Sequence, residues 1–246
     1  MVSESLKLFV KENFSLIENN EFQDLYVIAS NNLTPNQVGE LTEVLYLDLD
    51  INPLLHVKYV PPFYLSNARR IKKLTIPSNI IKISSEAFSN SWLETITIPK
   101  QVELVAGNAF SESEFLQEVI FEPGCERIGP DCFSGCRHLS SVKLGTATKI
   151  GGGAFFNCTS LSYIKLPEST HYIPAYCFQD AAITRLDIPK SVTGIGHDAF
   201  RGTQLDDVHY NGTVDEFLKI DIDKTGNMSL KESTVTCLDG EVKLND

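Results

Sequence analysis

Residues 93–110 read LETITIPKQVELVAGNAF, and residues 183–200 read ITRLDIPKSVTGIGHDAF. Both stretches contain an apolar triplet spaced i, i+3, i+5 that leads into a proline, and both end on a Phe that follows Ala. A Phe preceded by Ala or Cys recurs at intervals of 22 or 23 residues, at Phe88, Phe110, Phe133, Phe155, Phe178 and Phe200. This period predicts six stacked turns, none of which can bury its own apolar face alone.

Each repeat contains two further apolar signals. An aliphatic residue always stands five positions before the Phe, as Ile83, Val105, Ile128, Ile150, Ile173 and Ile195. The last two residues of the upstream triplet alternate with polar ones, which is typical of a short strand, and the following proline ends the strand. The pattern predicts a parallel sheet of about seven short strands and one buried Phe ring per turn.

The quoted stretches are similar to the repeats of BspA-like, or Treponema-type, leucine-rich repeat proteins. The closing stretches VHYNGTVDEFLKI (208–220) and VTCLDGEV (235–242) resemble the ending of the same family. The resemblance implies an α/β repeat fold, a right-handed leucine-rich repeat solenoid with its parallel strands on the concave face. The Asn ladder of commoner leucine-rich repeats is absent, so few regular helices are expected on the convex side. The fourth unit reads KLGTATKI (143–150) with Gly145 in place of Pro, which predicts a local irregularity.

The chain divides into three predicted segments. Residues 1–66 do not repeat and have helical apolar spacing, and Thr34 followed by Pro35 is typical of a helix N-terminus, so we expect a helical N-terminal cap. Residues 67–204 form the solenoid, and residues 205–246 form a C-terminal β cap. The N-terminal cap resembles segments of some phage and gut-bacterial repeat proteins.

The charge balance excludes some classes of partner. The 246 residues contain 21 Lys and Arg against 32 Asp and Glu, a net charge of -11 that would repel nucleic acid. Residues 67–204 are nearly neutral, with 13 acids and 14 bases. No apolar run approaches the roughly 18 residues of a membrane span, and the start VSESLKLFVKENF lacks the features of a secretory signal. These features predict a cytoplasmic protein, and we expect a monomer.

The sequence contains little that indicates a catalytic site or a metal site. Four of the six cysteines occupy repeat positions next to the buried Phe and lack paired CxxC spacing, which argues against zinc: Cys132, Cys136, Cys158 and Cys177. The run Gly151–Gly153 lacks the ending of a phosphate-binding loop and is interpreted as a turn. No His has an obvious nucleophile partner, so we expect neither an enzyme nor a cofactor. Residues 221–232 match an EF-hand loop at positions 1, 3, 6, 9 and 12, and Phe217 and Leu218 fit an entering helix, but residues 235–237 resemble a strand where the exiting helix should run, which leaves calcium binding open.

Strand alternation predicts the residues that face outward on the sheet. Two outward rows result, one running Lys73, Thr95, Glu118, Ser141, Tyr163, Arg185 and Asp207, and the other running Thr75, Thr97, Ile120, Lys143, Lys165, Asp187 and His209. Because Tyr and Arg are frequent in interface hot spots, we expect the partner to bind over the middle of these rows. The predicted partner-binding residues are Glu118, Ile120, Lys143, Tyr163, Lys165, Arg185, Asp187 and His209.

The leading functional hypothesis is a non-enzymatic protein-binding scaffold that uses the concave face. The cations and Tyr163 in the rows favour a protein partner with an acidic surface. Two alternatives stay open: a phage-encoded modulator or inhibitor of a host defence protein, and an adhesin-like surface ligand binder.

Overall fold

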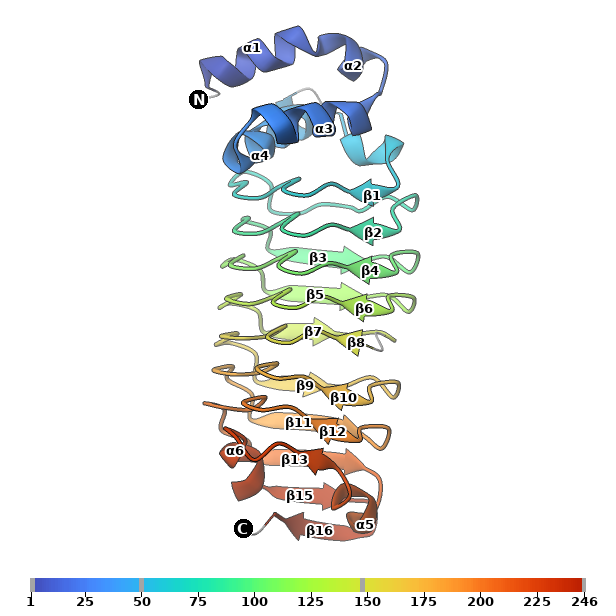
Figure 1. The fold of residues 1–246 in the computed structure, drawn as a ribbon, viewed down its shortest axis with the longest axis vertical. Helices are drawn as coiled ribbons and strands as arrows, with labels where there is room; N and C mark the ends of the chain where they lie inside the picture. Colours follow the sequence, from blue (N-terminus) through green and yellow to red (C-terminus); the bar gives the residue numbers. More distant parts are fainter. Residues whose placement is uncertain (1–2, 49–50, 147–148, 245–246) are drawn as a thin grey trace.

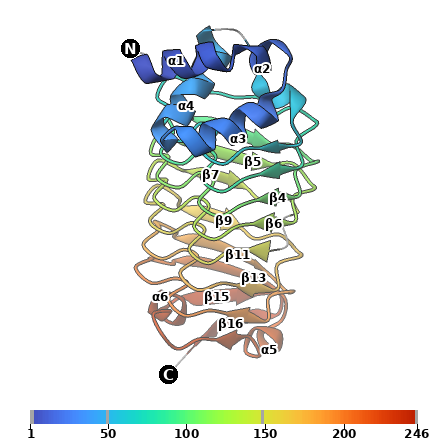
Figure 2. The same ribbon diagram turned by 45° about the horizontal axis from the view of Figure 1, so that its top comes forward.

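The computed structural model describes residues 3–48, 51–146 and 149–244. A column of stacked turns carries a helical segment at its N-terminal end and further strands at its C-terminal end (Figures 1 and 2). Within the described residues, no helix combines the length and the apolar character required to cross a bilayer.

Short helices make up the N-terminal segment, as the apolar spacing predicted. They are α1 (Glu4–Glu12), α2 (Phe14–Glu18), α3 (Phe22–Asn32), α4 (Pro35–Glu43), the π-helical η1 (Val44–Asp48) and the 3-10 helix η2 (Pro53–His56). Thr34 caps α4 with Pro35 in its first turn, and the side chain of Gln37 completes a capping box. The predicted N-terminus of this helix is therefore confirmed.

The helical segment packs directly on the first turn of the column. The ring of Tyr26 in α3 lies 5.7 Å from the ring of Tyr64, and both side chains are buried. The carboxylate of Glu43 accepts backbone hydrogen bonds from Arg69 and Arg70 at 2.6 and 2.9 Å. These contacts cover the apolar end of the column, which an open solenoid would expose to water.

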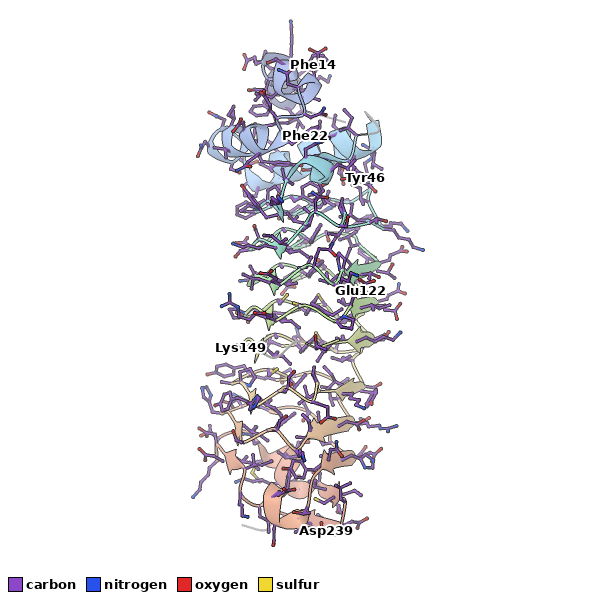
Figure 3. All side chains as sticks on the ribbon, turned by 90° about the vertical axis from the view of Figure 1, so that its right-hand side faces the viewer. Phe14, Phe22, Tyr46, Glu122, Lys149 and Asp239 are labelled. Carbon is purple, nitrogen blue, oxygen red and sulfur yellow. The ribbon has the colours of Figure 1, made fainter. Side chains whose placement is uncertain are left out.

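Two rows of parallel strands follow the column. The longer strands are β3 (Thr95–Ile98), β5 (Glu118–Phe121), β7 (Ser141–Lys143), β9 (Tyr163–Lys165), β11 (Arg185–Pro189), β13 (Asp207–Asn211) and β15 (Thr234–Cys237), followed by the antiparallel β16 (Gly240–Lys243). The two-residue strands are β1 (Tyr59–Val60), β2 (Lys82–Ile83), β4 (Leu104–Val105), β6 (Arg127–Ile128), β8 (Lys149–Ile150), β10 (Tyr172–Ile173), β12 (Gly194–Ile195) and β14 (Asp221–Ile222). We call the outer surface of the first row the long-strand face; Figure 3 shows Glu122, just after β5, and Lys149 of β8 on opposite sides of the column.

The long strands confirm the predicted parallel sheet, whereas the second row was not predicted. Each short strand between β2 and β12 ends on the aliphatic residue five positions before the repeat Phe. The strand β1 lies within the range 1–66 assigned to the N-terminal cap and pairs with β2, so strand pairing begins before residue 67. The boundaries 66/67 and 204/205 stay predictions.

The predicted column of aromatic rings fills the core. The six repeat Phe side chains are fully buried, and neighbouring ring centroids lie 4.9 to 5.6 Å apart with interplanar angles of 5° to 16°. Tyr64 extends the column at its N-terminal end, edge-on to Phe88 at 6.0 Å. Each ring therefore contacts the equivalent ring of the next turn, which is the packing that the repeat predicts.

Tight corners on both sides of each Phe explain the small and polar residues found there. Around Phe133, Asp131 and Gly135 have φ angles of 53° and 74°, in the left-handed region that Gly, Asn and Asp adopt most easily. In the triple glycine, Gly153 has φ of 64°, and a Cβ on Gly151 would lie 2.3 Å from the nitrogen of Pro130. Gly153 therefore allows a left-handed corner of the backbone, and Gly151 allows the backbones of neighbouring repeats to approach closely.

The predicted irregularity of the fourth unit lies partly outside the described residues. Gly145 has a positive φ of 59°, and residues 147–148 are outside the described ranges. Among the described strands, β7 is the last long strand of one sheet and β9 is the first of the next. In the row of short strands, one sheet ends at β8 and the next begins at β10. The long-strand face therefore has two hydrogen-bonded parts.

We expect Phe133→Ala to lower the free energy of unfolding by about 3 to 5 kcal/mol, because it removes a fully buried ring from the middle of the column and leaves a cavity. Chemical denaturation measures the change. The matched control is Phe14→Ala, because Phe14 is 46% exposed and lies at the outer end of the helical segment (Figure 3); its expected cost is below about 1 kcal/mol. Equal costs for the two variants would contradict the stacked core.

Candidate functional site

All eight predicted partner-binding residues lie on the long strands and face away from the core. The residues between them, such as Val119, Ile164 and Leu186, are buried, so the alternation expected of a half-buried sheet is present. Ile120, Asp187 and His209 are half-buried, while Tyr163, Lys165 and Arg185 are exposed. The sequence therefore identified the outward side of each strand correctly.

The break between β7 and β9 divides these residues into two groups. The Tyr163 group consists of Tyr163 and Lys165 on β9, Arg185 and Asp187 on β11, and His209 on β13. Its strands are in register, with Arg185 beside Tyr163 and Asp187 between Lys165 and His209. The Glu118 group consists of Glu118 and Ile120 on β5 and Lys143 on β7, where Ile120 pairs with Lys143.

Tyr163 and Arg185 form a cation–π contact at the centre of the Tyr163 group. The Cζ atom of Arg185 lies 4.9 Å from the centroid of the Tyr163 ring. The Tyr163 hydroxyl donates a hydrogen bond of 2.7 Å to Oδ2 of Asp187. Partial burial and this bond to a carboxylate raise the pKa of Tyr163, so the phenol stays protonated and donates at neutral pH.

Two carboxylates flank Arg185 on its Nε side. The Nε atom lies 3.4 Å from Oδ2 of Asp207 and 3.9 Å from Oδ1 of Asp187. Asp207 also contacts His209, with 2.7 Å between Oδ1 and Nε2. Arg185, one of the cations predicted to attract an acidic partner, is therefore flanked by two carboxylates on its Nε side, and this part of the face is mixed in charge.

The Glu118 group is also paired. The Nζ atom of Lys143 lies 3.6 Å from Oε1 of Glu118, and the hydroxyl of Ser141 donates to the same oxygen at 3.2 Å. Lys165, by contrast, forms no ion pair within 4.0 Å with any residue that the structure describes. Of the three cations predicted to attract a partner, Lys165 is the one without an ion pair in that part of the chain, although Asp187 stands beside it on the next strand.

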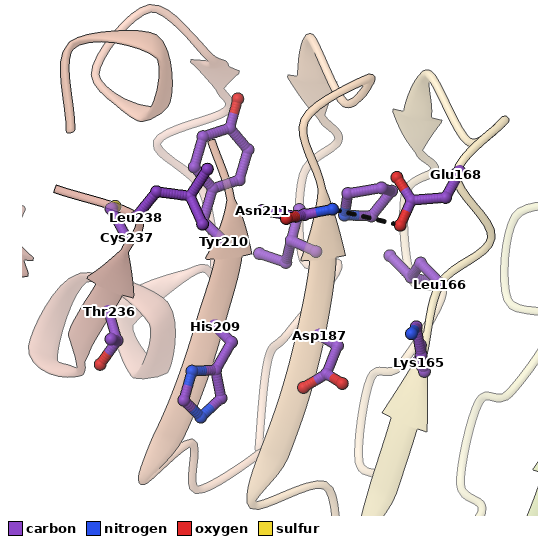
Figure 4. A pocket seen from close by; sticks show the side chains of 12 residues that line it. Lys165, Leu166, Glu168, Asp187, His209, Tyr210, Asn211, Thr236, Cys237 and Leu238 are labelled. Atoms are coloured by element: carbon purple, nitrogen blue, oxygen red, sulfur yellow. Dashed lines mark hydrogen bonds between the residues drawn. The ribbon is translucent and has the colours of Figure 1, made fainter. Parts of the chain in front are cut away.

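A hollow of about 510 Å³ lies beside the Tyr163 group (Figure 4). Lys165, Asp187 and His209 line one side in adjacent positions on β9, β11 and β13. On the other side, the amide of Asn211 donates to Oε1 of Glu168 at 3.3 Å. The hollow is open to solvent and combines charged groups with apolar walls, which suits a protein side chain at an interface.

One exposed cluster was missed from the sequence. The Trp92 ring is 37% exposed and lies 5.0 Å from the ring of Phe115, which is 41% exposed; the ring of His138 follows at 6.4 Å. The guanidinium of Arg69 lies 5.9 Å from the Trp92 ring. The three rings occupy the same repeat position, directly before the first residue of each apolar triplet. This shared position is a signal that the sequence contains, although it lies outside the strands on which the predicted rows stand.

A model of the BspA type leucine rich repeat region matches residues 48–147 and 144–234 of this chain. The chain belongs to the BspA-type leucine-rich repeat family. Its fold is similar to a crystal structure of a leucine-rich repeat protein from Bacteroides ovatus, with 25% sequence identity and a TM-score of 0.61 over 74% of this chain and 48% of that one. A leucine-rich repeat protein from Eubacterium ventriosum is 27% identical, with a TM-score of 0.57 over 60% of this chain and 41% of that one.

The BspA-type chain spans less than half of the length of each of these two structures. No curated protein shows a significant match to its sequence. The comparisons confirm the family and the fold that the repeat sequences indicated.

The cysteines serve the core of the BspA-type turns. In three successive turns, the residue three positions after the repeat Phe donates a hydrogen bond to the carbonyl of the Phe in the preceding turn. The hydroxyl of Ser113 donates to Phe88 O at 2.7 Å, and the thiol of Cys136 donates to Phe110 O at 3.0 Å. The thiol of Cys158 does the same at the next turn, at 3.2 Å. Burial raises the pKa of all six cysteine thiols above the ordinary value.

The loop that matched the EF-hand pattern forms the last BspA-type turn. Asp221 begins β14, and the side chain of Asn227 is fully buried, where it donates to the carbonyls of Gly196 and Asp223 at 3.0 and 2.9 Å. The hydroxyl of Ser229 accepts a bond of 2.8 Å from the backbone of Leu205. Within the described residues, no three His, Cys, Asp or Glu side chains are placed to hold a metal ion. The Ser229 hydroxyl, which stands at ligand position 9 of the EF-hand pattern, is thus used for a contact between turns.

We expect iodoacetamide to modify Cys132, Cys136, Cys158 and Cys177 in the native protein only as fast as the protein unfolds. Their thiols are fully buried and their pKa values are raised by desolvation, so the native rate divided by the denatured rate at the same pH should not rise between about pH 7 and pH 9. Mass spectrometry after timed labelling measures the rates, and denatured protein provides the control for full reactivity. A native rate that approaches the denatured rate at either pH would contradict the buried positions.

We expect Asn227→Asp to lower the free energy of unfolding by about 2 to 4 kcal/mol, because a carboxylate cannot donate to the two carbonyls and would be buried against them. Asp221→Asn is the control, since Asp221 is exposed and stands at position 1 of the same loop. Its expected effect is below about 0.5 kcal/mol. Thermal unfolding with and without calcium measures both variants, and a calcium-dependent stability that Asp221→Asn removes would restore the EF-hand interpretation.

Proposed function

We propose that this BspA-type chain is a non-enzymatic protein-binding scaffold whose partner lies on the long-strand face over the Tyr163 group. Leucine-rich repeat solenoids in general are protein-binding scaffolds, because their stacked turns present one extended surface. The observation that carries the proposal is the Tyr163–Arg185 pair, which is exposed and held in place by Asp187 and Asp207. Exposed Tyr and Arg side chains with fixed conformations are frequent centres of protein interfaces.

The chemistry of the described side chains supports a binding role. With raised pKa values, the six cysteine thiols are protonated at neutral pH and are weak nucleophiles. On the long-strand face, Arg185, Asp207 and His209 are paired with one another, an arrangement that fixes their positions. These features favour recognition of a surface over catalysis.

We propose a partner with an acidic surface next to Lys165. This lysine lies in the row of Asp187 and His209 and is exposed on the edge of the hollow. The Glu118 group would form the periphery of the same interface. The proposed scaffold acts as a monomer in the cytoplasm, without a nucleic-acid or membrane partner; these points stay predictions. No observation on this chain favours the phage-modulator or adhesin alternatives.

We expect the double variant Tyr163→Ala, Arg185→Ala to weaken partner binding by more than about 2 kcal/mol while the fold stays intact. The experiment uses affinity capture from the cytosolic fraction with the full chain, followed by quantitative mass spectrometry and a binding titration with the recovered protein. Circular dichroism and thermal unfolding verify the fold.

The control is Lys73→Ala with Thr75→Ala, on the same face at its N-terminal end. This variant should retain the partner. Undiminished binding by the Tyr163–Arg185 variant, together with loss of binding on substitution of exposed residues in the helical segment, would show that the partner binds at the helices.

A further inference from the structure

The two ends of the Arg185 guanidinium are used differently. Its Nε atom makes the closest approach to both neighbouring carboxylates, at 3.4 Å from Asp207 and 3.9 Å from Asp187. Neither Nη1 nor Nη2 donates a hydrogen bond to a residue in the described ranges. A guanidinium carries five N–H donors, so the end formed by Nη1 and Nη2 retains donors for another molecule.

The orientation of this end is fixed from two directions. The guanidinium lies over the Tyr163 ring at 4.9 Å, and the ring is itself held by the hydroxyl bond of 2.7 Å to Asp187. Asp187 contacts both Arg185 and Tyr163, so the three side chains position one another. Ordering a long side chain before binding reduces the entropy that the complex must lose.

We propose that Nη1 and Nη2 of Arg185 bind a carboxylate, the side chain of an Asp or Glu on the protein partner, in a bidentate contact. This inference rests on the proposed function and names the group that the Tyr163 group recognises. A planar carboxylate matches the two parallel N–H donors of a guanidinium end. Lys165, on the neighbouring strand and without an ion pair in the described part of the chain, adds a second positive charge to the same face.

The surrounding charges distinguish a carboxylate from a phosphate. Asp187 and Asp207 lie within 4.0 Å of the Arg185 Nε atom, so an arriving anion is repelled by two negative charges nearby. This repulsion grows with the charge of the ligand, and a phosphate carries about 1.5 to 2 negative charges at neutral pH. A singly charged carboxylate is therefore preferred.

The test uses nuclear magnetic resonance of the full chain with three probes: the peptide Ac-Ala-Glu-Ala-NH2, its neutral match Ac-Ala-Gln-Ala-NH2, and inorganic phosphate. The side-chain Nε–Hε signal of Arg185 reports binding directly, and assignment by Arg185→Lys identifies it. We expect the Glu peptide to shift this signal along a saturable curve with a dissociation constant of the order of 10 mM. The Gln peptide should cause no saturable shift, and phosphate should bind more weakly than the Glu peptide.

Two variants separate the bidentate contact from charge alone. Arg185→Lys retains the charge and loses the planar end, so backbone signals of β9 and β11 should report Glu-peptide binding weakened at least about fivefold. Tyr163→Phe retains the stacking ring and loses the bond to Asp187, and should weaken binding less than Tyr163→Leu. Equal binding of the Glu and Gln peptides, unchanged binding by Arg185→Lys, or tighter binding of phosphate would each overturn the proposal.

The outcome is separable from that of the proposed function. If the Tyr163→Ala, Arg185→Ala variant loses the captured partner but the Glu peptide does not bind at Arg185, the scaffold function stands and the carboxylate assignment fails. If the Glu peptide binds as expected but the double variant keeps the partner, Arg185 has a carboxylate site and the partner lies elsewhere.

Discussion

The stacking of one Phe ring on the next is the interaction on which the rest of the structure depends. Neighbouring rings lie 4.9 to 5.6 Å apart, close to the spacing of about 4.8 Å between hydrogen-bonded strands. Because the two spacings nearly agree, a turn that pairs its backbone with the previous turn also places its ring on the previous ring. Each turn must then return to the same point after 22 or 23 residues, which is why left-handed residues recur at the corners on both sides of each ring.

This constraint also gives the outer surface its organisation. Since every turn is held in register, residues at the same repeat position become neighbours along the column, whatever their chemistry. Tyr163, Arg185 and Asp207 are far apart in sequence and adjacent on the sheet for this reason alone. A substitution at an outward position changes the surface without changing the packing of the rings, so a scaffold of this kind can alter its binding surface one turn at a time.

The sequence predicted the Phe column and the outward rows of the long strands, and it missed the second row of strands and the contacts of individual side chains. The period located the Phe column, and alternation located the outward rows, because both follow from backbone geometry. The second row of strands was missed because its members, such as Lys82–Ile83, are too short to show alternation. The pairing of Arg185 with Asp187 and Asp207 was missed because a row of residues specifies neighbours but not the directions of long side chains. The Trp92–Phe115–His138 column does repeat in the sequence, but it lies outside the strands, where alternation predicts nothing.

The contacts of Arg185 with Asp187 and Asp207 contribute differently to stability and to the arrangement of the surface. Arg185 and Asp207 are about half exposed, and ion pairs at such positions contribute little to stability, with a median near 0 to 1 kcal/mol. The buried ring column beneath them contributes far more, since a single buried ring is worth about 3 to 5 kcal/mol. The network therefore contributes little to the stability of the fold, and its physical effect is to hold Tyr163 and Arg185 in one arrangement. A conformation that is fixed at the surface without being needed by the core is the property expected of a recognition site, because binding then requires little further ordering of its side chains.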